Sequence, residues 1–403
     1  MGFARLVQLD VFFFATVPMA DAGNGGPLPT ERRYGPEAFA AVYDNLFRWA
    51  GTADRLGYDT LWLAEHHFQY EGYEVVPNAI QLGMAMAMRT DRLRQGQMFN
   101  IVPQWHPLRL AEDFALANIV TGGRMVLGVG RGTVPREAMT LGAAVASGDN
   151  AMSREADRVN REMFEEAMEV ITLALTQERF SFTGKHYQFP PLGIPDRGAF
   201  VSELTLVPRP TREVEIYQAI TSPETMAYAP ARGHRGVYWQ TPPEVLKPRW
   251  DDYAEVAAAH GRELGPGEGR VLVLNVHVGA TREKAIAAVR DGHDEFCRFL
   301  APYGRFKAFR RPDGSAVPFD HQPTLEESID NRIWAVGSAE DVAETVGFYR
   351  DLLGVEHLVV FVEAPGLAAE QIDEQLHLVA EDVLPRLGEM PSRPELTRAA
   401  AAR

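Results

Sequence analysis

Two adjacent histidines follow a glutamate at the point where an apolar segment ends. Residues 61–68 read LWLAEHHF, so the apolar run gives way to Glu65, His66 and His67. An imidazole changes charge near neutral pH, so a histidine at a strand end is a candidate general acid or base; the alternative is a structural histidine. Neighbouring residues of a strand point to opposite faces, so these two histidines cannot easily bind one metal ion. The sequence has no HExxH motif and no Cys/His cluster, and we expect no metal site.

A short glycine-rich stretch, GVGRG at residues 128–132, places an arginine between small residues. It matches the dinucleotide-binding motif GxGxxG poorly, because Thr133 stands at the last glycine position. Small residues at a strand end allow a flat ring to approach the backbone, and Arg131 can bind a phosphate through two N–H groups. The alternative is that Gly128 and Gly130 only relieve crowding inside the fold.

The stretch TSPETMAY, residues 221–228, has the residue types of a helix start. Ser222 is a favourable N-cap, and the proline after it suits the first helical position. The free N–H groups of the first turn, with the hydroxyls of Ser222 and Thr225, form an anion site if the carboxylate of Glu224 points away from it. The alternative is a plain helix cap, but next to Arg131 the same residues would form a phosphate clamp.

Strand-like and helix-like segments alternate along the chain and would place these residues on one face. The expected strands are residues 5–15, 58–64, 93–102, 125–129, 214–220, 236–240, 270–278 and 357–362. Several are continuous apolar runs, which is typical of parallel strands buried on both faces. Eight strand–helix units predict a (β/α)₈ barrel, a TIM barrel, in which functional residues lie at the carboxyl ends of the strands. His66, Arg131 and Ser222 all follow expected strands.

Two segments interrupt the alternation, and we expect them to be insertions in a single domain spanning residues 1–403. They are residues 179–211, which are dense in proline and glycine, and residues 301–333. Because a long insertion at a barrel often forms a lid or a pocket wall, we expect the first one to cover the site.

The composition limits the classes of partner. The formal net charge of −15 disfavours binding to nucleic acid or to an anionic membrane. The one cysteine, Cys297, excludes an internal disulfide and favours a cytoplasmic protein in which Cys297 has a packing role. We find no signal-peptide pattern, and the longest strongly apolar segment is too short to span a bilayer.

Three motifs together resemble the bacterial luciferase-like flavin-dependent monooxygenases: EHHF, HPLRLAEDFALANIVTGGR and LGVGRG. The resemblance covers roughly residues 6–387 and is most specific over residues 58–132. It implies a (β/α)₈ barrel that binds reduced FMN and casts His66 as the catalytic histidine. It also implies that Arg131, Ser222 and Thr225 bind the FMN phosphate.

The same resemblance concerns the place of the flavin ring. It implies a cis peptide between Met98 and Phe99 beneath the ring. Gly130 stands where the luciferases carry a reactive cysteine, so the chain resembles a general monooxygenase more than a light emitter. Thr221 stands where the luciferases have a glutamate at the phosphate site.

The function that the resemblance implies is oxygenation of a small, hydrophobic organic substrate by reduced FMN and O₂. A separate flavin reductase would supply the cofactor, and a homodimer is expected. Aromatic residues near strand ends could line the substrate pocket or form barrel core: Phe12, Phe14, Trp62, Phe99, Trp105 and Trp239. Two alternatives stay open: a deazaflavin-dependent oxidoreductase on the same fold, and a flavin-binding barrel without catalysis.

Overall fold

Parallel strands form a closed barrel in the computed structural model of the protein, which describes residues 8–145, 151–311 and 314–388. The barrel strands in the described ranges are β1 (Gln8–Phe13), β2 (Thr60–Leu63), β3 (Arg94–Gln97), β5 (Met125–Gly130), β10 (Ile216–Ala219), β11 (Arg235–Tyr238), β12 (Arg270–Val278) and β14 (His357–Phe361). They pair in that order, and pairing of β14 with β1 and of β10 with β5 closes the ring. The predicted (β/α)₈ barrel is therefore confirmed. Residues 5–7 of the first expected strand lie outside the described ranges.

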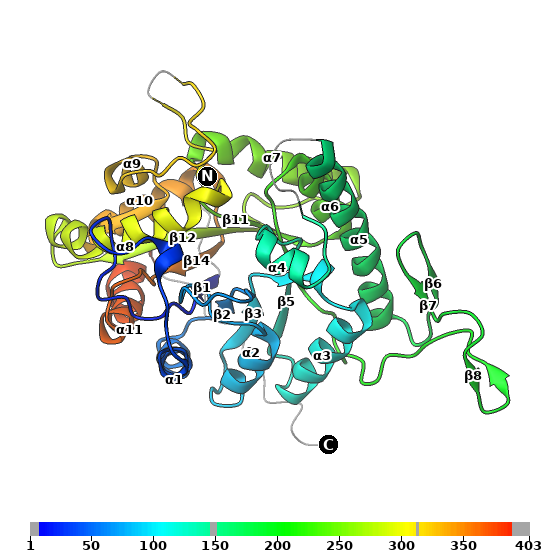
Figure 1. The fold of residues 1–403 in the computed structure, drawn as a ribbon. Helices are drawn as coiled ribbons and strands as arrows, with labels where there is room; N and C mark the ends of the chain where they lie inside the picture. The colour runs from blue at the N-terminus through cyan, green and yellow to red at the C-terminus, as the bar shows by residue number, and fades with distance from the viewer. Residues whose placement is uncertain (1–7, 146–150, 312–313, 389–403) are drawn as a thin grey trace.

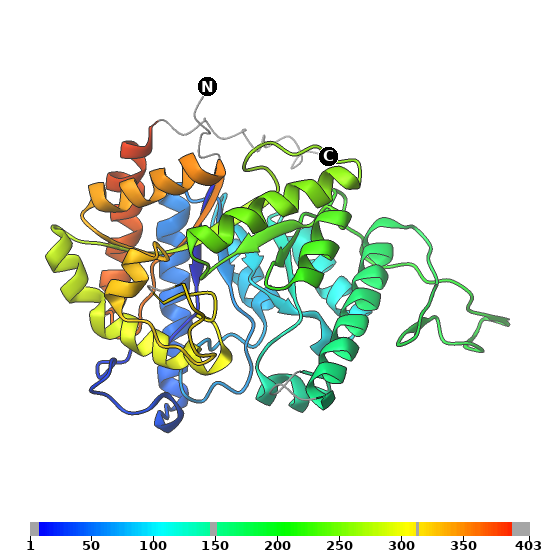
Figure 2. The ribbon, with the colours of Figure 1, turned by 90° about the horizontal axis from the view of Figure 1, so that it is seen from above.

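Helices surround the barrel on its outside (Figures 1 and 2). They are α1 (Pro36–Leu56), α2 (Ala79–Ala87), α3 (Pro107–Val120), α5 (Ala151–Thr176), α6 (Pro223–Arg232), α7 (Pro243–Ala259), α10 (Ala339–Leu353) and α11 (Ala369–His377). The boundaries follow local signals: α1 begins at Pro36 and ends at Gly57, whose φ of 94° favours glycine. None of the helices in the described ranges has the length and apolar character needed to cross a membrane.

The third expected strand is divided in two. β3 ends at Gln97 and β4 (Asn100–Ile101) resumes the pairing with β5, with Met98 and Phe99 between them. The chain is crowded here, because a Cβ at Gly128 would lie 1.6 Å from the carbonyl oxygen of Gln97. Gly128 is therefore required by packing, as the alternative interpretation proposed.

The strand β12 is longer than its neighbours and pairs with two strands in succession. Its residues Leu272–Asn275 pair with β14, and Asn275–Val278 pair with β13 (Trp334–Gly337), a strand that the sequence did not predict. The segment between β12 and β13 contains α8 (Arg282–Leu300) and α9 (Leu325–Asp330). We call residues 279–333 the cover, because α8 brings Phe296 against the residues at the strand ends: its ring lies 5.7 Å from Phe14 and 5.6 Å from Phe361.

The proline- and glycine-rich insertion, which we call the arm (residues 177–215), leaves the end of α5 and projects away from the barrel (Figures 1 and 2). It contains two short antiparallel pairs, β6 (Phe182–Thr183) with β7 (Gln188–Phe189) and β8 (Pro195–Asp196) with β9 (Ala199–Phe200). Its base is fixed to α5 by the carboxylate of Glu166, which accepts the N–H groups of residues 185–187. Phe189 of the arm packs edge-on against His106 in the loop after β4, with ring centroids 5.2 Å apart. That the arm covers the site stays a prediction.

Candidate active site

The ring of His66 lies between two carboxylates. His66 is in the loop after β2, and its side chain is 14% exposed. Its Nδ1 lies 3.1 Å from Oε1 of Glu137 on α4 (Pro135–Thr140), and its Nε2 lies 3.1 Å from Oε1 of Glu74. The carboxylates are 2% and 5% exposed, so all three groups are largely shielded from water. Burial alone would lower the pKa of His66, but Glu74 and Glu137 outweigh it and raise the pKa to about 10.

Further polar side chains hold Glu137 in place. Gln69 donates its Nε2–H to Glu137 Oε1 at 2.7 Å, and Arg136 in turn donates to Gln69 at 3.0 Å. Arg136 also forms an ion pair with Glu71 at 2.7 Å. Burial raises the pKa of Glu137, but the hydrogen bond to His66 and its charge lower it overall. Glu137 is therefore a carboxylate anchored from two sides.

The second histidine, which also lies in the loop after β2, has a different partner. His67 Nε2 lies 2.9 Å from Oε1 of Glu65, which is 1% exposed. Glu65 also accepts the backbone N–H of Ile101 at 3.1 Å and the indole N–H of Trp105 at 2.8 Å. Glu65 thus connects the end of β2 to β4 and to the chain that follows β4. In the EHHF motif, the glutamate and His67 contact each other, whereas His66 faces a separate acidic cluster.

The cover contributes side chains to the acidic cluster around His66. Arg305 donates from Nη2 to Oγ1 of Thr133 at 3.1 Å, and its charge acts on Glu74. Burial is the main cause of the raised pKa of Tyr303. The charges of Arg136, Glu74 and Glu137 also act on this pKa, so Tyr303 lies near the cluster. The segment beyond α8 therefore forms part of the site, which the sequence did not predict.

A buried ionic network fixes the cover to the strand-end loops. Glu295 on α8 accepts Nε–H and Nη2–H of Arg32 at 2.9 and 3.0 Å. It also accepts the hydroxyl of Tyr73 and the N–H of Gly23. Tyr73 immediately precedes Glu74, so the loop that carries both His66 and Glu74 is held by the cover.

The predicted phosphate clamp lies where β5 and β10 pair. Arg131 follows β5 directly, and Ser222 caps α6 after β10, so strand pairing brings them to one corner of the barrel. Ser222 Oγ accepts the N–H of Thr225 at 3.3 Å, and Thr225 Oγ1 accepts that of Ser222 at 3.0 Å. Arg131 forms an ion pair with Asp157 on α5 at 3.0 Å, and its charge also acts on Glu224. That these residues bind a phosphate stays a prediction.

One detail of the clamp differs from expectation. Glu224 does not point away from the helix start: hydrogen bonds from its own backbone N–H and from Ser222 lower its pKa. Its Oε1 lies 3.4 Å from Nη1 of Arg161. A carboxylate at this end is favourable because the first N–H groups of a helix attract negative charge. A bound phosphate would have to displace Glu224 or share these donors with it.

The residues expected beneath a flavin ring lie together. The peptide bond between Met98 and Phe99 is cis. A Cβ at Gly130 would lie 3.1 Å from Cβ of Phe99, so the absence of a side chain lets the two backbones approach. Phe99 is partly exposed, so its ring is accessible to a ligand at this strand end. Their role in binding a cofactor stays a prediction.

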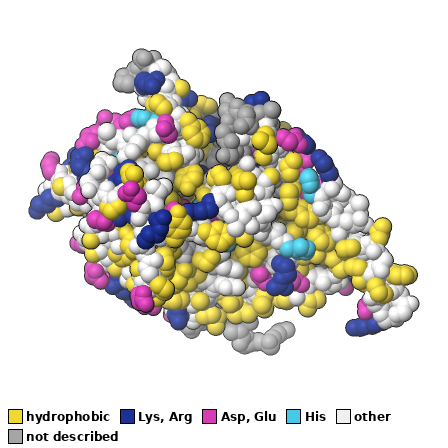
Figure 3. Space-filling view, in the orientation of Figure 1, with side chains coloured by type: hydrophobic (Ala, Val, Ile, Leu, Met, Phe, Trp, Pro, Cys, Tyr) yellow, Lys and Arg dark blue, Asp and Glu magenta, His cyan; other side chains and the backbone are white. Residues whose placement is uncertain are grey.

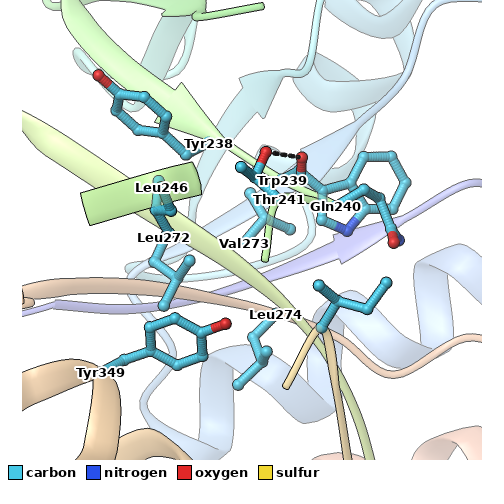
Figure 4. Close-up of a pocket in the computed structure, with 10 residues that line it drawn as sticks. Tyr238, Trp239, Gln240, Thr241, Leu246, Leu272, Val273, Leu274 and Tyr349 are labelled. Carbon is cyan, nitrogen blue, oxygen red and sulfur yellow. Dashed lines mark hydrogen bonds between the residues drawn. The ribbon is translucent and has the colours of Figure 1, made fainter. Parts of the chain in front are cut away.

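Half of the six aromatic residues proposed for a substrate pocket belong to the core. Phe12, Phe14 and Trp62 are buried, and Trp239 packs edge-on against Phe12 and Phe14 with centroids 5.7 and 5.5 Å apart. Partial exposure leaves Phe99, Trp105 and Trp239 able to contact a ligand. A small cavity beside β11 and β12 lies behind the barrel wall (Figure 4) and is lined by Tyr238, Leu246, Leu272, Leu274 and Tyr349. It is on the side of the barrel opposite β2 and His66.

The site thus contains residues that the sequence analysis missed. Glu74, Glu137 and Arg305 belong to three separate segments, and none stands in a recognisable motif. Within the described ranges, no group of three or more His, Cys, Asp or Glu side chains is arranged to hold a metal ion.

Comparisons with known proteins bear on this arrangement. The profile of the luciferase-like monooxygenase family matches residues 14–356. The chain belongs to this family. It is 28% identical over 313 residues to 4-hydroxyprotoasukamycin monooxygenase from Streptomyces nodosus subsp. asukaensis, covering 74% of this chain and 76% of the relative. It is 25% identical over 356 residues to F420-dependent glucose-6-phosphate dehydrogenase from Amycolatopsis mediterranei (strain U-32), covering 85% and 94%.

A solved structure of the same fold is the oxygenating constituent of 3,6-diketocamphane monooxygenase from Pseudomonas putida, determined in complex with FMN. Its TM-score to this luciferase-like protein is 0.74, with 21% sequence identity, over 96% of this chain and all of the other. The relatives are oxidoreductases that include both monooxygenases and a deazaflavin-dependent (F420) enzyme, so the family by itself leaves the cofactor open.

Proposed function

We propose that this protein is an FMN-dependent monooxygenase that uses reduced FMN and O₂ to oxygenate a small, hydrophobic organic substrate. The observation that carries the proposal is the meeting of Arg131 with the capped start of α6 at one corner of the catalytic face, with His66 in the loop after β2. With Glu224 displaced, that corner would offer a guanidinium, two hydroxyls and the first N–H groups of a helix to a single phosphate group, which FMN carries. The FMN complex of a structural neighbour supports the same choice.

The residues have distinct roles in this proposal. Arg131, Ser222 and Thr225 hold the phosphate, and the Met98–Phe99 peptide with Gly130 supports the ring. Reduced FMN supplies the two electrons that activate O₂. His66 holds a proton at Nε2, and the aromatic plug formed by Phe14, Phe296 and their neighbours excludes water from the reacting edge.

A second candidate is a deazaflavin-dependent oxidoreductase, which would transfer hydride without O₂. It is supported by the F420-dependent relative, which matches over most of both chains. The phosphate corner gives no reason to prefer it.

The test is equilibrium binding of FMN, riboflavin and F420 to the protein and to its Arg131→Ala variant. A charge-assisted hydrogen bond contributes about 1.5–3 kcal/mol, so the variant should bind FMN about ten- to a hundredfold more weakly, with a much smaller change for riboflavin, which has no phosphate. Equal losses for both flavins would contradict the clamp, and tighter binding of F420 than of FMN would favour the second candidate.

The proposal also includes partners. A separate flavin reductase would deliver reduced FMN, and the protein would act as a cytoplasmic homodimer. Nucleic acid and membranes are not proposed partners, because of the strongly acidic net charge of −15.

A further inference from the structure

The position of His66 between two carboxylates limits its protonation states. A neutral imidazole has one N–H and one lone pair, and a lone pair cannot form a hydrogen bond with an ionised carboxylate. With both ring nitrogens 3.1 Å from carboxylate oxygens, either the ring carries two protons or one carboxylate is protonated. In both cases the three groups share two protons and have a net charge of −1. Neutral His66 beside two ionised carboxylates is the unfavourable state.

The surrounding charges decide between the two remaining states. Glu74 faces His66 from the loop after β2 and Glu137 from α4, and both act to keep the ring positive. The other charged or titratable groups near this cluster, from α4, the loop after β2 and the cover, are Arg136, Glu71, Tyr303 and Arg305. The two arginines favour ionised carboxylates, so the imidazolium with two carboxylates is the expected state.

The two carboxylates are held differently. Glu137 also accepts from Gln69 at 2.7 Å. Among the described residues, the carboxylate of Glu74 forms no hydrogen bond or ion pair except the contact with His66, and the backbone φ of Glu74 is +50°. The charge of Arg305 acts on Glu74 from the cover and would stabilise the carboxylate if it left the ring. Glu74 is therefore the carboxylate that can move away from His66, and this movement would expose Nε2 of the ring.

We propose that Glu74 takes part in the reaction. Together with Glu137 it keeps His66 doubly protonated, and it moves away from the ring so that His66 donates its Nε2–H to an atom of the bound ligand. His66 then acts as an acid and not as a base at neutral pH. The protonation state is a property of the flavin-free protein, whereas the donation to a ligand rests on the proposed function.

The first experiment is a nitrogen-15 NMR titration of the histidine side chains in the flavin-free protein from about pH 5.5 to about pH 9. His66→Gln assigns the signals of His66. We expect both ring nitrogens of His66 to stay protonated over the whole range. In Glu74→Gln and in Glu137→Gln the midpoint should fall by about 1–3 pH units, because each removes one nearby opposite charge.

Glu71→Gln is the matched control, because Glu71 lies in the same loop but forms its ion pair with Arg136. It should leave both His66 signals protonated across the range. A His66 midpoint near its ordinary value of about 6.5 in the unaltered protein would overturn the proposal. So would a Glu74→Gln variant that titrates like the unaltered protein.

The second experiment measures solvent exchange of the two ring protons in the same sample. If Glu74 is the partner that yields, Nε2–H should exchange at least about tenfold faster than Nδ1–H, since only its side opens. Equal rates, or faster exchange at Nδ1, would overturn the role of Glu74.

Binding of FMN to the same variants separates this proposal from the proposed function. A protein that shows the expected titration and exchange but does not bind FMN would refute the proposed function and leave the proton arrangement standing. A protein that binds FMN through Arg131 but has a neutral His66 would refute only the inference made for Glu74.

Discussion

The arm and the cover are both long insertions in one barrel, but the structure uses them in opposite ways. The cover carries Phe296, which is 1% exposed, and places Glu295 in a buried ion pair with Arg32. The arm carries Phe200, which is 74% exposed, and forms surface ion pairs such as Arg179–Glu203. The space-filling view shows hydrophobic side chains on the outside of the arm (Figure 3).

This difference shows that amino-acid composition can identify an insertion but does not tell where the insertion lies relative to the site. The arm was expected to be the lid because it is rich in proline and glycine, yet it begins where α5 ends and projects away from the barrel (Figure 1), with Phe189 against His106 as its contact with the loop after β4. The cover begins after β12, whose extra length carries the chain past the barrel rim before α8 returns across it. The place where an insertion leaves the barrel decides what it can reach.

The largest expected difference concerns the two phenylalanines. Phe296→Ala should lower the free energy of unfolding by about 3–5 kcal/mol, because it opens a cavity among Phe14, Trp239 and Phe361. The matched arm variant Phe200→Ala should change it by less than about 0.5 kcal/mol. Denaturant unfolding of both variants measures the contrast, and similar losses would show that the arm is packed in solution.

The two glutamates give a second contrast. Glu295→Gln should destabilise the protein by about 3 kcal/mol, because it removes the buried carboxylate partner of Arg32 and leaves only the more exposed Asp21 paired with it. Glu203→Gln breaks an exposed pair and should cost at most about 1 kcal/mol. The same unfolding measurement applies, and a small loss for Glu295→Gln would mean that the network does not hold the cover.

The acidic cluster beneath the cover should also make stability depend on pH. Because the pKa of His66 is raised to about 10, its contribution is fully present below its unfolded value of about 6.5 and is lost as the pH rises towards 10. The stability difference between the protein and His66→Gln should therefore shrink above pH 7, by up to about 1.4 kcal/mol per pH unit. A difference that stays constant, measured by unfolding at several pH values, would contradict the raised pKa.

The smallest effects are expected in hydrogen exchange on binding FMN. The loop at residues 64–78 and the segment at residues 301–309 should become more protected, because they surround His66, while the arm should not change. Exchange followed by mass spectrometry with and without FMN tests this. Protection of the arm instead would restore it as the lid and exchange the roles assigned to the two insertions.

The amino-acid sequence by itself determined the barrel and the places of three candidate residues. The apolar runs and helix boundaries are local signals, so the expected strands appear with nearly the expected limits. The positions of His66, Arg131 and Ser222 follow because carboxyl strand ends meet on one face of a barrel. The expectation that His66 and His67 point to different sides also agrees with the structure, in which they contact different carboxylates, although both lie in the loop after β2.

Only the tertiary structure decided what His66 contacts. Glu137 lies 71 positions away in the sequence, and Arg305 meets Thr133 across 172 positions. A carboxylate that raises a histidine pKa must lie within a few ångströms of the ring, and no local pattern records such a contact. The position of the cover was hidden for the same reason: it depends on β12 running past β14 to pair with β13, and that register is set by packing between distant segments.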